Sequence, residues 1–506
     1  MITSFSYAIP SAFDSARDRA SLSLAPDARR PLRFVGRVTD HVLQVRFALQ
    51  GLGRVIWSDD TWHDDLTFGW RTLDPVVTVH PDRLMLEAFS QDLSTWGCVL
   101  LPRERFETEG EVVCGTTNVD FTAWLAAALD EMRSSRQTWL RVEPGGVEVR
   151  TDGYGGRHEP KVDVPDPWLR AYLSLQAAMA MPGTRLEVRP VDLLHAVRYL
   201  SVTKARVSPR GLRFELRPDE DAALILEPWE HEIALKGAWH GGTEARTVRV
   251  WGRRRLRLLE PLLPHATAAR VYLKGRALPW AVAVDLPGGI TFLLVLSGFT
   301  ARAFAGSGYR LLAPDDAPED VVRRAHAVLR ERVAIGTPAL AEALGVDLPT
   351  AARATARLCR RGLGIWDLER RELRHRELLA DPVDEEALFP PDERELEGRR
   401  LLPAVRLTSS GFRETRKLRR LKTPDGPIER ELVFRDLVVG AEVDGQTTEI
   451  VLSDEDRLIF GRCTCTFFAE HLLNQGPCAH LVATRLAADA LRARSSDGEG
   501  SGDGTL

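Results

Sequence analysis

The chain is poor in cysteine and lacks the short motifs of several large enzyme classes. Six cysteines occur in 506 residues, without disulfide-like spacing. The dipeptide Gly-Lys never occurs, which excludes a Walker A phosphate-binding loop, and neither HExxH nor GxSxG is present. His63-Asp64-Asp65 offers ligands for a metal or a proton, but it follows Trp62 in a turn-like stretch, and a solvated loop is the favoured interpretation. We therefore expect a protein that is not an enzyme.

Long apolar runs and a strong charge imbalance are missing too. The longest apolar stretch, Ile290 to Phe299, is too short to cross a bilayer. Met1 to Phe5 shows no basic stretch followed by an apolar run, so we expect neither a signal peptide nor a membrane partner. The net charge of −4 means that nucleic-acid binding would need a local basic patch. Because the cysteines are grouped as for a metal, we expect a cytoplasmic protein.

The first part of the chain predicts β-structure. Residues 1–118 alternate short apolar runs, such as 42–47 and 76–79, with turn clusters, and tryptophans are frequent there. That alternation is typical of strands joined by tight turns. We therefore expect a β-rich N-terminal region over 1–118.

Residues 119–316 mix helical and strand patterns and predict an α+β region. Residues 121–132 have helical spacing, and 247–251 predict a strand. Each of two further predicted hairpins has a turn containing proline and glycine. The paired segments are 140–142 with 147–149, and 205–207 with 212–216.

Residues 317–378 show the element order of a winged-helix domain. Pro318 opens one helix, Thr337-Pro338 a second, and Asp347 with Pro349 a third, before a short hairpin over 363–376. An acidic, proline-bearing linker (379–400), a zinc-binding domain (401–488) and a disordered tail (489–506) complete the prediction. The expected fold class is α+β and multidomain, with a mixed α/β N-terminal region, a winged-helix-like domain and a C-terminal strand-strand-helix zinc finger.

Four strong zinc ligands fall within eighteen positions near the C-terminus. Cys463 and Cys465 are separated by one residue, and so are Cys478 and His480. Zn²⁺ prefers four thiolate or imidazole ligands in a tetrahedron, and Cys₃His is a common structural set. The alternative is that these cysteines are buried core thiols. Nearby His471 is interpreted as a non-ligand, since the set is already complete.

The pattern Cys-X-Cys, gap, Cys-X-His resembles the SWIM-type zinc finger. The resemblance covers about residues 430–488, with all four ligand positions filled, a strand and a turn expected over 437–445, and further strands at 448–452 and 458–460. It implies a strand-strand-helix scaffold, one structural Zn²⁺, and binding to DNA or to a protein. Four ligands close the shell, whereas a catalytic zinc usually keeps a position open for water.

The winged-helix-like segment also carries an arginine stripe. Arg353, Arg357, Arg360 and Arg361 lie at i, i+4, i+7 and i+8 of the third helix, the element that enters the major groove in helix-turn-helix proteins. A second basic run spans Arg413 to Lys422. Both runs are equally compatible with a solvated face or a protein contact.

Together these patterns predict a zinc-binding adaptor or recognition subunit. Stand-alone bacterial proteins that this layout resembles are often encoded beside MoxR-type AAA ATPases, which implies a protein partner in such a system. The first alternative is a DNA-binding regulator that uses the arginine stripe. The second is an uncharacterised enzyme in residues 1–316.

Overall fold

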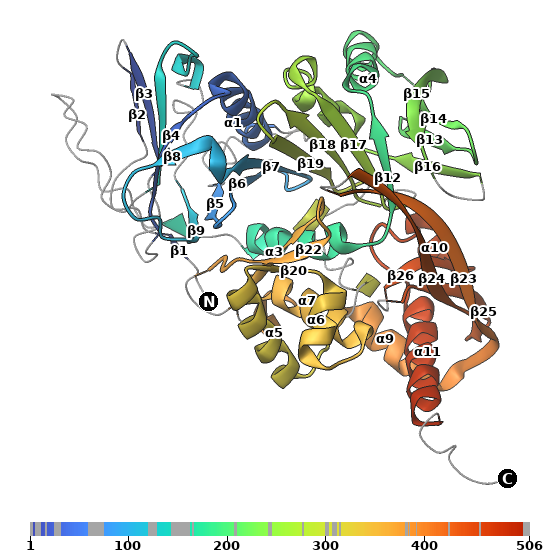
Figure 1. Ribbon diagram of the computed structural model, residues 1–506. Coiled ribbons are helices and arrows are strands. Elements are labelled where there is room, and N and C mark those ends of the chain that lie inside the picture. Colours follow the sequence, from blue (N-terminus) through green and yellow to red (C-terminus); the bar gives the residue numbers. More distant parts are fainter. Residues whose placement is uncertain are drawn as a thin grey trace.

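The structure is a computed structural model of the 506-residue chain (Figure 1). It describes residues 4–5, 12–15, 18–24, 32–58, 75–119, 129–142, 162–163, 166–206, 210–240, 245–275, 278–298, 303–305, 311–312, 315–379, 383, 385–390, 392–423, 426–454 and 457–498. The β-sheets of the N-terminal three fifths form the upper part in Figure 1, with the later helices and the C-terminal sheet below them. Sheets and helices are both abundant, so the α+β class is confirmed.

An eight-stranded antiparallel sheet is the largest one that the described residues form. Along one strand, β6, alternate side chains enter two different cores: Leu84 and Leu86 pack on one side, Met85 and Phe89 on the other. The first face is covered by α1 (Val42–Ile56) and the second by α3 (Asp166–Ala180). The strands, in spatial order, are β12 (Thr184–Val188), β17 (Ala268–Leu273), β18 (Trp280–Leu286), β19 (Ile290–Leu296), β7 (Thr95–Pro102), β6 (Arg83–Phe89), β5 (Val76–Val79) and β9 (Gly115–Asn118).

The predicted strand at 42–47 is wrong, because those residues begin helix α1. Over only six residues, 42–47, the pattern of apolar and polar side chains is also compatible with a strand. Over the full fifteen residues the buried positions include Val45, Leu49, Leu52 and Ile56, which is helical spacing. The predicted strand at 76–79 is confirmed as β5.

A smaller sheet lies beside α1. It contains β2 (Ala12–Ser15), β3 (Arg19–Leu24), β10 (Gln137–Val142), β4 (Phe34–Val38) and β8 (Phe106–Thr108), and the two-residue strands β1 (Ser4–Phe5) and β11 (Val162–Asp163) pair separately. Strand β10 lies between β3 and β4. Residues 147–149, the predicted helix before 129 and His63-Asp64-Asp65 lie outside the described residues.

The third sheet has the order β15-β14-β13-β16 and packs beside α4 (Pro190–Val202). Its strands are β13 (Leu212–Leu216), β14 (Asp221–Leu226), β15 (His231–Trp239) and β16 (Arg246–Val250). The strand expected at 247–251 is therefore confirmed. The hairpin of 205–207 with 212–216 is wrong, because β13 pairs with β14 and β16 instead. Short 3₁₀ helices follow at Arg253–Leu259 and Leu263–His265.

Residues 319–377 form what we call the three-helix unit. It contains α5 (Glu319–Arg332), β20 (Ala334–Ile335), α6 (Thr337–Leu344), α7 (Leu348–Arg360), β21 (Gly364–Asp367) and β22 (Glu372–His375). The expected helix starts are found: Asp347 caps α7 by accepting a hydrogen bond from the Thr350 amide at 2.9 Å. Gly345 ends α6 with φ 65°, a conformation that favours glycine.

The stretch expected to be an open linker is folded. It contains α8 (Glu385–Leu388), α9 (Glu393–Leu401) and a 3₁₀ turn (Leu402–Ala404), and Phe389 is buried. Helix α9 packs on α11 at Gly398, where a Cβ atom would lie 2.6 Å from a Val482 methyl group. The charged sequence suggested a solvated segment, but this one glycine allows the two helices to approach closely.

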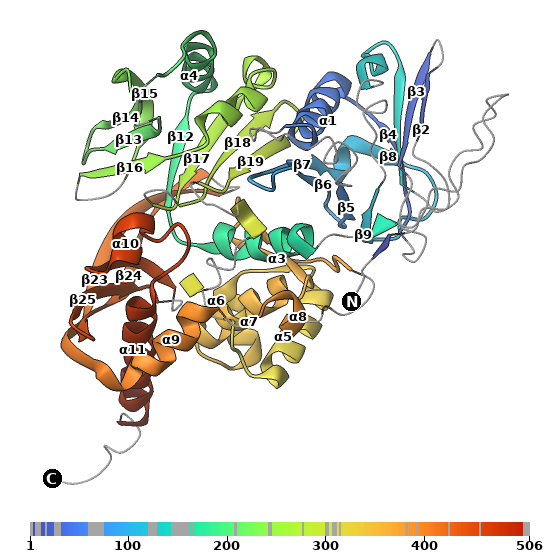
Figure 2. The same cartoon turned by 180° about the vertical axis from the view of Figure 1, so that it is seen from behind.

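The C-terminal module, residues 405–498, holds a four-stranded sheet and two helices. The elements are β23 (Val405–Thr423), β24 (Gly426–Val443), β25 (Gln446–Leu452), β26 (Leu458–Cys463), α10 (Thr466–His471) and α11 (Ala479–Gly498). Figure 2 shows α11 beside α9. Helix α11 continues to Gly498, so the disorder expected from 489 is wrong up to that residue, and 499–506 lie outside the described residues.

The paired strands β23 and β24 extend past the end of β25 as a two-stranded ribbon, formed by residues 413–423 and 426–436. Strand β25 pairs with β24 only from Leu437 to Val443, whereas β23 and β24 stay paired up to Thr423 and Gly426. In the described part of the sheet, residues 413–423 and 426–436 thus have no third strand. The ribbon arches from the module toward the β12 end of the large sheet (Figures 1 and 2).

One apolar core joins the parts that the sequence suggested were separate. It contains residues of the large sheet, α3, the three-helix unit and the C-terminal module, among them Trp96, Leu358 and Leu481. Polar anchors reinforce it: the Trp366 amide donates to Gln176 at 2.6 Å, and Arg457 donates to the Ala180 carbonyl. Among the described residues, every helix is too short or too polar to cross a membrane.

Candidate metal centre

The structure brings Cys463, Cys465, Cys478 and His480 together. One ligand atom from each lies within 4.8 Å of the others. Cys463 ends β26, Cys465 precedes α10, Cys478 precedes α11, and His480 lies in the first turn of α11. His471 is outside this cluster, with its Nδ1 atom 3.5 Å from Gln475 Nε2.

Tight backbone turns produce this convergence. After α10 the chain reverses at Leu472, whose φ is 52°, and at Gly476, whose φ is 88°. Gly476 tolerates this left-handed conformation without the steric cost that a side chain brings. The Gly476 amide donates to the Leu473 carbonyl at 2.9 Å, and Pro477 follows directly. These turns place the second ligand pair opposite the first.

Backbone amides are directed at the sulfur atoms. The Cys465 amide lies 3.5 Å from Cys463 Sγ, and the Phe468 amide lies 3.5 Å from Cys465 Sγ. A hydrogen bond from the Cys478 thiol lowers the pKa of Cys463 to about 5, and the same bond raises the pKa of Cys478. The three sulfurs are close enough to share protons, and a cation that replaces those protons would hold all three as thiolates.

The donor set fits a zinc ion. His480 Nδ1 is buried and has no hydrogen-bond partner among the described residues. Zn²⁺ binds sulfur at about 2.3 Å and imidazole nitrogen at about 2.0–2.1 Å, which places tetrahedral ligand atoms about 3.3–3.8 Å apart. Small side-chain rotations bring atoms already within 4.8 Å to that spacing. Bound there, the ion would crosslink β26, α10 and α11.

Contacts outside the cluster hold its backbone in place. The Thr484 hydroxyl lies 2.9 Å from the His480 carbonyl and 2.7 Å from the Thr448 hydroxyl. Arg394 of α9 donates to the Gln475 carbonyl, and its guanidinium lies 5.2 Å from the centre of the Phe467 ring. The sequence analysis missed Arg394, because it assigned α9 to a linker.

The arginine stripe on α7 is half-buried and paired with carboxylates. The four side chains are only 13% to 28% exposed, and α7 packs against α3, α5 and α6. The pairs are Arg353 with Asp316 (3.7 Å), Arg357 with Glu385 (3.2 Å), Arg360 with Asp315 (2.7 Å) and Glu385 (2.8 Å), and Arg361 with Glu319 (2.6 Å) and Glu385. Paired charges attract a polyanion less strongly than unpaired ones.

Two further arginines attach the three-helix unit to the large sheet. Arg376 and Glu87 form an ion pair at 2.8 Å in which both side chains are 0% exposed. Arg374, 2% exposed, contacts Asp82, and Arg83 lies 3.1 Å from Asp367. Their partners are almost 300 residues away, so no local pattern identifies these arginines as internal.

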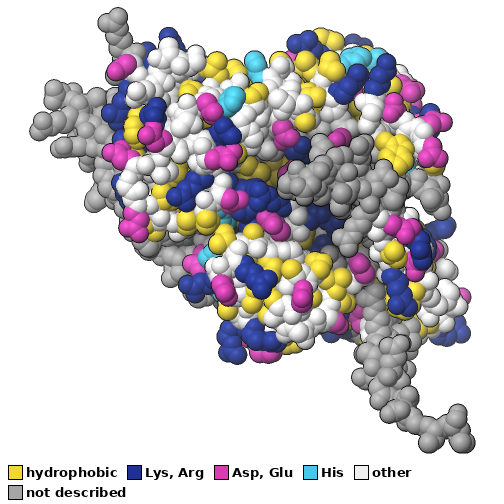
Figure 3. Space-filling view, in the orientation of Figure 1, with side chains coloured by type: hydrophobic (Ala, Val, Ile, Leu, Met, Phe, Trp, Pro, Cys, Tyr) yellow, Lys and Arg dark blue, Asp and Glu magenta, His cyan; other side chains and the backbone are white. Residues whose placement is uncertain are grey.

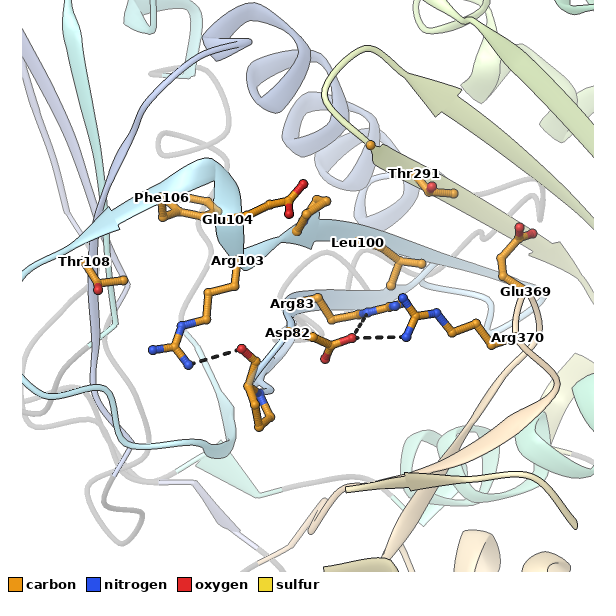
Figure 4. A pocket seen from close by; sticks show the side chains of 13 residues that line it. Asp82, Arg83, Leu100, Arg103, Glu104, Phe106, Thr108, Thr291, Glu369 and Arg370 are labelled. Carbon is orange, nitrogen blue, oxygen red and sulfur yellow. Dashed lines mark hydrogen bonds and ion pairs between the residues drawn. The ribbon is translucent and has the colours of Figure 1, made fainter. Parts of the chain in front are cut away.

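A pocket of about 820 Å³ lies between β6, β7 and the β21–β22 turn (Figure 4). Three of its charged side chains are paired with each other: Asp82 contacts Arg83 at 3.1 Å and Arg370 at 3.3 Å. Among the described residues that line the pocket, none is histidine, cysteine or serine. Figure 3 shows Lys and Arg mixed with Asp and Glu across this middle zone. The described lining of the pocket is therefore charged and contains no histidine base.

Comparison with known proteins adds little. The chain matches no protein-family profile and no curated protein. Similar solved structures include PCNA from Thermococcus kodakaraensis, at 13% identity and a TM-score of 0.35, covering 53% of this chain and 100% of that chain. Proliferating Cellular Nuclear Antigen from Entamoeba histolytica is also similar, at 9% identity and a TM-score of 0.36, with the same coverage. Scores this low support no conclusion.

Proposed function

We propose that this chain is a cytoplasmic, non-enzymatic zinc protein with a SWIM-type finger, acting as an adaptor or recognition subunit. The observation that carries the proposal is the Cys₃His cluster at the base of a projecting β-ribbon. Four ligands fill a tetrahedral shell and leave no position for a reacting water. The zinc then shapes a surface, and the ribbon is the most prominent part of that surface.

One face of the ribbon has the composition of a protein contact. Cross-strand pairing places Phe412, Glu414 and Arg416 on the same face as Val433 and Arg435, and we call these five residues the ribbon face. All five are exposed, with Phe412 at 55% and Val433 at 51%. Aromatic and arginine side chains dominate the energetics of protein interfaces.

Backbone chemistry supports the same role. An isolated two-stranded ribbon is marginally stable in water, so a protein that keeps a long one gains from covering it. Strand β23 is also the edge of its sheet in the described part of the chain. An edge strand can accept an extended segment of a partner by main-chain hydrogen bonds. We therefore favour a protein partner, and a MoxR-type AAA ATPase is the first one to examine.

The alternative of a DNA-binding regulator rests on a winged-helix interpretation of the three-helix unit. The order of three helices and a hairpin agrees with that interpretation. However, the arginines of α7 are paired with Asp315, Asp316, Glu319 and Glu385, and the helix lies against α3. Binding of DNA by α7 would have to break these pairs, which makes this function the less favoured one.

Affinity purification from the native host, read by mass spectrometry, tests the proposal. We expect a protein partner that wild type and Arg406→Ala retain, since Arg406 lies outside the ribbon face and is 82% exposed. Phe412→Ala/Arg435→Ala and Cys463→Ser should both lose it. Equal recovery by all four proteins would contradict the proposed role.

Fluorescence anisotropy with duplex DNA at several salt concentrations tests the alternative. Binding that falls steeply with salt and is lost in Arg357→Ala/Arg361→Ala would establish α7 as the interface. Binding that is absent, or unaffected by these substitutions, would leave the adaptor role as the better explanation.

A further inference from the structure

Strand β22 and the residues just after it present two chemically different faces. Because side chains alternate along an extended segment, Arg374 and Arg376 lie on one face, and His375 and Glu377 on the other. The arginines reach Asp82 and Glu87 of the large sheet. His375 and Glu377 face helix α5, which contributes His326.

These three side chains form a compact ligand cluster. One nitrogen of each histidine and one Glu377 oxygen all lie within 4.8 Å of one another. His375 Nε2 is 3.4 Å from Glu377 Oε1, close to the separation of about 3.4 Å between two ligand atoms of a tetrahedral zinc ion. The two imidazole rings are stacked with centroids 5.7 Å apart.

One nitrogen of each histidine is buried without a well-formed hydrogen bond. Among the described residues, Nε2 of His326 has no hydrogen-bond partner, and Nε2 of His375 has the 3.4 Å contact with Glu377. A buried polar atom without a partner costs free energy, and a metal ion is a partner that satisfies both atoms at once.

We propose that His326, His375 and Glu377 form a second metal site, distinct from the cysteine cluster, for a divalent transition-metal ion such as Zn²⁺ or Co²⁺. Two imidazoles and one carboxylate are ligands that such ions accept. Three protein ligands leave a coordination position for water. The site therefore binds its ion more weakly than the four-ligand cluster and exchanges it with solvent, to which Glu377 is 51% exposed.

A metal ion bound at this site would link α5 to β22, the strand whose Arg374 contacts the large sheet. The His375 amide already donates to the Val333 carbonyl at 2.8 Å, at the end of α5. A metal ion would add a second tie between the same elements, one that depends on metal concentration. Exposed Arg330 lies near both histidines and opposes the ion's charge.

Equilibrium dialysis against Zn²⁺ and Co²⁺ tests the site. Wild type should bind two equivalents, and His326→Ala and His375→Ala one. Cys463→Ser should retain the second equivalent, and Co²⁺ in that site should lack the absorption of cobalt–thiolate bonds. The matched control is His195→Ala, which removes one member of another histidine pair, whose Nε2 atoms are 3.4 Å apart.

Two exposed positions keep the test valid if a histidine variant fails to fold. Loss of an outer-shell partner alone weakens metal binding about 10–100-fold, so Glu377→Gln, which removes a ligand, should weaken the second equivalent at least about tenfold. Arg330→Gln should tighten it by removing a positive charge. The proposal is overturned if wild type binds one equivalent, if Glu377→Gln binds like wild type, or if His195→Ala loses the second equivalent.

Discussion

The C-terminal module and the three-helix unit share one apolar core, but different polar groups reinforce each of them. The module has a cluster of four side chains that could hold a metal ion, drawn from eighteen consecutive positions. The three-helix unit is fastened by ion pairs such as Arg376 with Glu87, whose members are 289 residues apart. Interactions between residues close in the sequence leave a recognisable sequence pattern, whereas ion pairs between distant residues do not.

This difference separates two kinds of arginine that look alike in the sequence. The arginines between 353 and 376 and those between 413 and 422 both form dense basic runs. In the first run Arg374 and Arg376 are internal, whereas in the second Arg413 and Arg416 are exposed by 58% and 63%. Arginines of both runs have carboxylate partners, so charge density alone does not identify an interaction surface, and the two runs differ in how deeply their side chains are buried.

The largest expected effect comes from breaking the metal fastening. Cys463→Ser should lose the bound zinc and unfold residues 437–488 locally, because zinc supplies on the order of 10 kcal/mol to comparable fingers. Hydrogen exchange measured by mass spectrometry should show protection lost there and kept in β6 and β7. The control is Cys114→Ser, at an exposed thiol, which should exchange like wild type. Unchanged protection in Cys463→Ser would mean that the cluster does not hold the module together.

The next effect comes from breaking the buried ion pair. Arg376→Met should destabilise the fold by about 3–5 kcal/mol, since it leaves Glu87 buried without its counter-charge. The double variant Glu87→Leu/Arg376→Met should recover most of that loss, because no charge then remains buried. Urea denaturation measures both. If the double variant is no more stable than the single one, packing rather than charge explains the effect.

A smaller, pH-dependent effect is expected at Glu385. Burial alone would raise its pKa, but hydrogen bonds from Arg361 and Arg360 outweigh burial and hold the pKa below the ordinary 4.5. The carboxylate therefore stabilises the fold fully above about pH 4.5, and this contribution is lost as the pH falls through the folded-state value. Glu385→Gln should cost about 1–2 kcal/mol at pH 7 and progressively less in acid. A stability difference from wild type that does not change with pH would contradict this account.

The sequence predicted local features well. The convergence of the three cysteines with His480, the strands leading to Cys463, the Asp347 cap and the Gly345 turn are all found where short-range chemistry placed them. Zinc spacing and helix caps act over a few residues, so their signals survive in the sequence.

Features that depend on distant partners could not be predicted. Residues 42–47 alternate like a strand, but the large sheet needs a helix over its face, and α1 supplies it. The charged segment 393–401 becomes a packed helix because Gly398 meets Val482. His326 and His375 are 49 positions apart in the sequence, so only the folded chain brings them together.

The alternation of side chains along residues 372–377 also affects the strand register of the β21–β22 hairpin. A slip of one residue reverses every side chain of a strand. A slipped β22 would turn Glu377 toward Glu87 in place of Arg376, setting two carboxylates against each other in a site closed to water. The alternation of arginine with histidine and glutamate thus disfavours the misaligned register once the hairpin packs on the large sheet.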